Sequence, residues 1–112
     1  MQIIYLVVSF PDDAVINKIL SQLNDDLSHR HAVTQCFFYS DAVAIGAVQC
    51  YSHQTKILLN SLDEHHIPLR LCSAAFQRRH YQLNSTVKQA LTFQGLGQFI
   101  NEVAQSDNIR IF

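Results

Sequence analysis

The chain has 112 residues, of which 48% are hydrophobic, and its formal net charge is -1 at pH 7. This length suits one compact domain and is too short for two separate cores, so we expect a single domain over residues 1–112. The near-neutral charge and the absence of any run of lysine or arginine disfavour direct binding to nucleic acid or to an anionic membrane.

The first apolar run, residues 2–8, predicts a buried strand, because a short and nearly continuous apolar run suits a sheet covered on both faces. This run lacks the basic flank and the cleavage site of a signal peptide, and it is too short to span a membrane. We therefore expect a cytoplasmic protein, in which the three widely separated cysteines are free thiols.

A helix is predicted to begin near Pro11 and the two aspartates that follow it. Apolar residues recur there at helical spacing, at Val15, Ile16, Ile19, Leu20, Leu23 and Leu27. Residues 33–39 then predict a second strand. The small residues of segment 42–48 predict a short helix, with Ser40 and Asp41 as a possible cap.

Residues 55–66 predict the next helix, and Pro68 follows closely enough to mark its end. Residues 69–72 form the third predicted strand, which leads directly into a helix at 73–79. The polar segment 81–88 is predicted to be irregular.

The last part of the chain predicts a short strand at 91–93, a tight turn at 95–97 and a closing strand at 109–112. A helix between the turn and the last strand has its apolar face at Leu96, Phe99, Ile100 and Val103. Because strands alternate with helices, we expect an α/β domain with a mostly parallel sheet of about five strands and helices on both sides.

Cys72 is the main candidate for chemistry. It is placed at the carboxyl end of a predicted strand, where parallel α/β folds bind ligands, and a helix N-terminus at this point would stabilise a thiolate. The same position also suits a small buried residue, so location alone leaves both interpretations open. Cys36 lies among strand residues and is expected in the core, whereas Cys50 is expected to be structural or incidental.

Arg78 and Arg79 add positive charge at the end of the helix that follows Cys72. Such cations complement the helix dipole and could also meet an acidic partner. Cys72 and Arg78 have the C-x5-R spacing of cysteine phosphatases and rhodanese-type sulfurtransferases. However, residues 73–77 contain no glycine that would let the backbone amides curl around an anion, so a phosphatase is a remote alternative.

No metal or cofactor is predicted. The histidine pairs at positions 29/31 and 65/66 lack a third ligand at the spacing of a structural metal site. The two glycines at 95 and 97 lack the third glycine of a dinucleotide-binding fingerprint, and no Gly-x-Ser-x-Gly motif is present.

Four segments resemble the TusD/DsrE family, in the same order along the chain: residues 37–43, 71–79, 92–97 and 107–112. The most specific of them is the Cys-x-Ala-Ala segment that begins at Cys72 and is followed by two arginines. The resemblance implies a three-layer α/β/α flavodoxin-like domain, DsrE-like over residues 1–112. It also implies that Cys72 carries a persulfide in a protein-to-protein sulfur relay, with Arg78 and Arg79 as possible electrostatic support.

In the TusD branch of the family, the relay serves synthesis of 2-thiouridine at the tRNA wobble position. The implied partners are TusB-like and TusC-like paralogues in a hetero-oligomer and a TusE-like sulfur carrier, without direct contact to nucleic acid or membrane. The alternatives are a DsrE-like subunit in cytoplasmic sulfur oxidation and a non-catalytic scaffold of the relay complex. Residues 9–13 and 81–89 are shorter than the corresponding family segments, so a homo-oligomer is a further alternative.

Overall fold

A computed structural model describes residues 1–112. At its centre is a five-stranded sheet with the order β4-β3-β2-β1-β5, and every neighbouring pair of strands is parallel. The strands are β1 (Gln2–Val7), β2 (Ala32–Phe38), β3 (Leu69–Cys72), β4 (Leu91–Gln94) and β5 (Asn108–Ile111). Successive crossovers therefore build the sheet outward from β1 to β4, and the chain then returns to add β5 beside β1.

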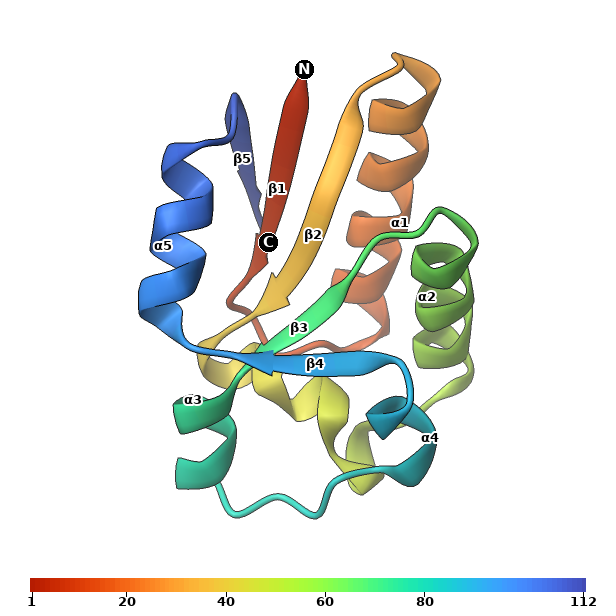
Figure 1. Ribbon diagram of the computed structural model, residues 1–112. Helices are drawn as coiled ribbons and strands as arrows, with labels where there is room; N and C mark the ends of the chain where they lie inside the picture. The colour runs from red at the N-terminus through yellow and green to blue at the C-terminus, as the bar shows by residue number, and fades with distance from the viewer.

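Helices cover both faces of this sheet (Figure 1). Helices α1 (Asp13–Ser28) and α2 (His53–Glu64) pack side by side on one face, and α5 (Leu96–Ala104) covers the other. The three-layer α/β/α flavodoxin-like fold expected from the sequence is confirmed, and the sheet is wholly parallel rather than mostly parallel.

The remaining short helices are α3, α4 and two 3-10 helices, η1 and η2. Helix α3 (Ser73–Arg78) and η1 (Ser40–Gly46) lie at the carboxyl ends of the strands, at the bottom of the view in Figure 1. Helix η2 (Val48–Cys50) follows η1, and α4 (Ser85–Lys88) precedes β4. No helix in the structure is both long and apolar enough to cross a membrane.

Two local predictions were wrong and a third was right only in part. The small-residue segment after β2 forms a short helix, as predicted, but it is a 3-10 helix, η1, which starts at Ser40 with a left-handed φ of 56°, so Ser40 and Asp41 lie within it rather than at its cap. A helical turn, α4, replaces the expected irregular segment, because the Asn84 side chain caps two backbone amides while Val87 is buried. The glycines at 95 and 97 do not make a tight turn, because Gly95 is the N-cap of α5 and the helix begins at the next residue.

The core is centred on β1, as its apolar sequence predicted. Ile3, Ile4, Tyr5 and Val7 are all fully buried. One polar group is buried beside them: Asp26 of α1 accepts a hydrogen bond of 2.6 Å from the Tyr5 hydroxyl and one of 2.7 Å from Arg110 Nη2. This buried network joins β1, α1 and β5.

Candidate functional site at the carboxyl end of β3

Cys72 lies where the sequence placed it. It is the last residue of β3 and the N-cap of α3, which begins at Ser73. Its surface is only 2% exposed, and its side chain makes no capping hydrogen bond to the helix. The predicted junction of strand and helix is confirmed, but the thiol is covered by its neighbours rather than open to solvent.

A polar cluster lies on the same face of the sheet as Cys72, under α5. Gln94 of β4 is the register partner of Cys72, and its Nε2 donates to Glu102 of α5. Glu102 also accepts a hydrogen bond from Gln35 of β2 and one of 2.9 Å from Arg70 Nη1, two residues before Cys72. Alternation along the strand places Arg70 and Cys72 on one face. No local pattern in the sequence predicted this cluster, because its members come from four separate elements.

The other two cysteines are poorly suited to form thiolates. Cys36 is fully buried in the core, as expected, and burial raises the pKa of its thiol. Cys50 is half-buried, and its pKa is raised by burial and then by the negative charges of Asp13 and Asp12. Of the three thiols, Cys72 is the one at the carboxyl edge of the sheet next to a helix N-terminus.

Arg78 and Arg79 extend from the end of α3 and turn back along the helix. Arg78 Nε donates to the Ala74 carbonyl at 3.3 Å, and Arg79 Nη1 donates to the Ala75 carbonyl at 3.0 Å. Both arginines thus satisfy carbonyl groups at the helix end. Arg79 Nη2 also forms an ion pair of 3.1 Å with Asp41, at the start of η1.

These two arginines line an open polar pocket of about 240 Å³ together with Tyr39, Ser40 and Ala75. Cys72 does not line this pocket, but the elements that form it border the strand and the helix that meet at Cys72. Tyr39 directly follows β2, in which Phe38 is opposite Leu71, and Ala75 lies in the first turn of the helix that Cys72 caps. Tyr39 and Ser40 both lie in the segment 37–43 that resembles the TusD/DsrE family, but the sequence predicted neither as a site residue and gave Ser40 only as a possible cap.

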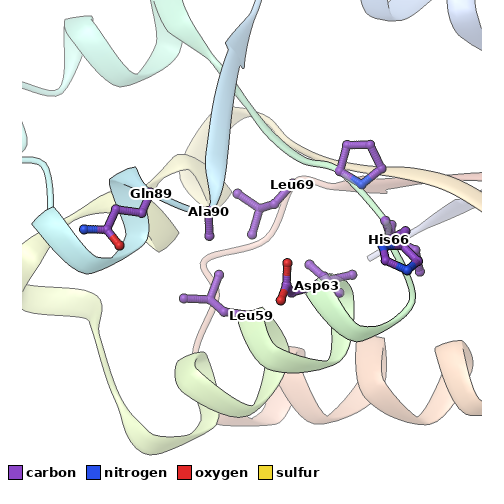
Figure 2. Close-up of a pocket in the computed structure, with 9 residues that line it drawn as sticks. Leu59, Asp63, His66, Leu69, Gln89 and Ala90 are labelled. Carbon is purple, nitrogen blue, oxygen red and sulfur yellow. The ribbon is translucent and has the colours of Figure 1, made fainter.

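A second pocket, of about 270 Å³, lies at the opposite edge of the sheet. Figure 2 shows it between the end of α2 and the amino ends of β3 and β4, where Leu59, Leu69 and Ala90 provide apolar walls and Asp63 a carboxylate. Because β3 begins at Leu69 and ends at Cys72, this pocket is separated from the thiol by the length of the strand.

The geometry does not favour phosphatase chemistry. Residues 73–77 are helical from the first residue after Cys72, so they form no loop of amides around an anion. No three His, Cys, Asp or Glu side chains gather in an arrangement that could hold a metal ion.

No protein-family model matches the chain. Among curated proteins, it is 28% identical to a sulfurtransferase TusD homolog of Haemophilus influenzae, over 74% of this chain and 76% of that relative. It is 29% identical to the TusD homolog of Pasteurella multocida, with the same coverage. Among solved structures, the ychN protein from E. coli superposes over 100% of both chains with a TM-score of 0.72, at 17% identity.

The two kinds of similarity agree with each other and with the motifs in the sequence. The named relatives support a role at the level of the sulfurtransferase family. The superposition supports the fold over the whole chain. Together, the relatives, the shared fold and the segments around Cys72 support the resemblance of this chain to the TusD/DsrE family.

Proposed function

We propose that this protein is a sulfurtransferase subunit that carries sulfur as a persulfide on Cys72 and passes it from one protein to another. The observation that carries the proposal is the position of Cys72 at the carboxyl end of β3 and the start of α3. Parallel α/β folds bind ligands at this edge, and the amides at the start of a helix stabilise a thiolate. The names of the two relatives support sulfur transfer as the general role.

The proposed reaction is an exchange between sulfur atoms. The Cys72 thiolate attacks the outer sulfur of a donor persulfide, a new S–S bond forms, and the donor leaves as a thiolate with the electron pair of the broken S–S bond. An acceptor thiolate then attacks the outer sulfur of the Cys72 persulfide in the same way. Arg78 and Arg79 lend electrostatic support to the anionic sulfur.

The burial of Cys72 requires that a donor gain access to the sulfur. Helix α3 is only 6 residues long, and it is the element that begins directly at the thiol. Short helices receive most of their stability from tertiary packing, so α3 is the element best suited to move aside when a sulfur donor approaches the thiol.

As partners we propose TusB-like and TusC-like paralogues in a cytoplasmic hetero-oligomer and a TusE-like carrier, in a pathway to tRNA wobble 2-thiouridine. A DsrE-like role in sulfur oxidation is the alternative within the same chemistry. The 2% exposure of Cys72 favours one candidate of another class, a scaffold subunit in which Cys72 only packs in the core.

One experiment separates the sulfur carrier from the scaffold. The protein is incubated with inorganic polysulfide, and the mass of the intact chain and of its cysteine peptides is measured. We expect one added sulfur on Cys72, which Cys72→Ser loses and the matched control Cys50→Ser retains. Sulfur found only on Cys36 or Cys50, or no added sulfur at all, contradicts the proposal. The scaffold predicts the latter result.

A further inference from the structure

The pocket between the end of β2 and α3 has an excess of positive charge. Two guanidinium groups line it, whereas Asp41 is the one acidic residue paired with them. Arg79 already has partners for its charge, since it binds both the Ala75 carbonyl and the Asp41 carboxylate. The positive charge of the pocket that is left without a counter-ion therefore belongs to Arg78.

Arg78 is held in place but is not neutralised. Its one hydrogen bond, from Nε to the Ala74 carbonyl, fixes the side chain along α3, and it takes part in none of the four ion pairs of the protein. The two terminal nitrogens of the guanidinium are thus available to a ligand. A guanidinium presents its N–H groups as a planar fork that matches the oxygens of a carboxylate or a sulfonyl group.

The other lining residues add hydroxyl groups rather than apolar surface. Tyr39 and Ser40 directly follow β2 and line the pocket together with the arginines, and Ala75 contributes only a methyl group. A pocket of about 240 Å³ lined by two guanidiniums and two hydroxyls suits a small anion with several oxygens and does not suit an apolar ligand.

We propose that this pocket binds a small oxyanion between the end of β2 and the helix that Cys72 caps, with Arg78 as its charge partner and the Tyr39 hydroxyl as a donor. The inference rests on the proposed function and extends it to the chemistry of the sulfur donor or acceptor. Two sources present such a group: a free sulfur oxyanion such as thiosulfate, and a carboxylate of a protein that docks at Cys72.

With thiosulfate, the transfer is balanced without any other reactant. The Cys72 thiolate attacks the outer sulfur, a new S–S bond forms, and the bond between the outer sulfur and the sulfonyl sulfur breaks. Sulfite leaves with the electron pair of that bond. The pocket would hold the sulfonyl oxygens, and α3 would have to move for the covered Cys72 sulfur to reach the outer sulfur.

Binding is tested first, on the Cys72→Ser variant, so that no sulfur chemistry intervenes. Sodium sulfate and sodium acetate are titrated separately at constant ionic strength, and backbone and arginine side-chain NMR shifts are followed. We expect saturable shifts at Tyr39, Ser40 and α3 for at least one of the two anions. Adding Arg78→Gln should weaken this binding roughly tenfold, since it removes a charge-assisted hydrogen bond.

Two matched variants keep the test specific. Lys88→Gln removes the same charge from an exposed position on α4, outside the pocket, and should leave the affinity unchanged. Tyr39→Phe removes only a hydroxyl and should weaken binding severalfold. No saturable binding of either anion, or equal losses in Arg78→Gln and Lys88→Gln, overturns the proposal.

To identify the source of the oxyanion, the wild-type chain is incubated with thiosulfate and its mass is measured. Mass gain of one sulfur on Cys72, with release of sulfite and dependence on Arg78, identifies the free donor. Binding of sulfate or acetate without any such gain identifies a carboxylate of a docked protein. If the chain binds the anion but gains no sulfur from polysulfide, the persulfide function is contradicted while the oxyanion site is supported. Failure of the proposed function and failure of the oxyanion site therefore give different results.

Discussion

Replacement of Arg110 tests how much the stability of the fold depends on a charge partner for the buried carboxylate of Asp26. The Asp26 side chain is 1% exposed, and the Arg110 side chain is 30% exposed. Arg110 donates two hydrogen bonds to this carboxylate, of 3.2 Å from Nε and 2.7 Å from Nη2. In Arg110→Met, the charge of Asp26 stays buried, and only Tyr5 and Gln22 remain as donors.

The expected loss is about 3 kcal/mol of unfolding free energy at pH 7, because breaking a buried pair leaves an uncompensated charge. This value lies at the lower end of the usual range, since Arg110 is partly exposed and two other hydrogen bonds to Asp26 persist. Urea unfolding followed by circular dichroism measures the loss.

The dependence on pH gives the sharper test. Burial alone would raise the pKa of Asp26, but hydrogen bonds from Arg110, Tyr5 and Gln22 outweigh it, so the folded-state pKa is lowered. In the wild type, the contribution of Asp26 to stability is therefore present above about pH 4 and is lost as the pH falls through the lower, folded-state pKa.

In Arg110→Met, burial should dominate and raise the pKa of Asp26 above its unfolded value. The contribution of Asp26 to stability should then increase, rather than decrease, as the pH falls. Stability should then rise as the pH falls from 7 to 5, and the difference from the wild type should shrink. The double variant Asp26→Asn/Arg110→Met has no charge to bury and should not show this rise. A loss in Arg110→Met that is the same at pH 7 and pH 5 would refute the reasoning.

Three further predictions concern the core, the Glu102 cluster and Cys50. A Cβ at Gly46 would lie 2.8 Å from Leu71 Cδ2 and 3.2 Å from Phe76 Cε2, so Gly46→Ala should cost about 1–3 kcal/mol in urea unfolding. Gly97→Ala is the control in open space on α5, and it should be neutral or stabilising. Glu102→Ala should cost about 2–3 kcal/mol, because Gln35, Gln94 and Arg70 lose their shared acceptor; no loss would mean that the cluster is not formed. Asp13→Asn should speed alkylation of Cys50 at pH 7, because removing a nearby negative charge lowers the pKa of that thiol. The increase in rate should be modest, since burial is the larger cause of the raised pKa. An unchanged rate would contradict the role of Asp13.

The sequence was informative wherever a local pattern decides structure. The continuous apolar run of β1 predicted a buried central strand, and Leu69–Cys72 was placed at its observed bounds because a proline precedes it and a helix follows. Local propensity failed where packing or capping decides. Asn84 organises α4 through its side chain, and Gly95 caps α5 although its spacing to Gly97 resembles a turn.

For the candidate site, the sequence was enough to predict Cys72 and its neighbours along the chain. Cys72 at the end of a strand and the two arginines six and seven positions later are local features, so their order sufficed to relate them. The tertiary structure alone decided that Cys72 is covered, that Arg79 is paired with Asp41 and that Arg78 is not. It also brought Tyr39 and Ser40 to the same pocket and set Glu102 among three polar side chains from β2, β3 and β4. These contacts join residues far apart in the chain, and only the register of parallel strands, which no local pattern encodes, brings them together.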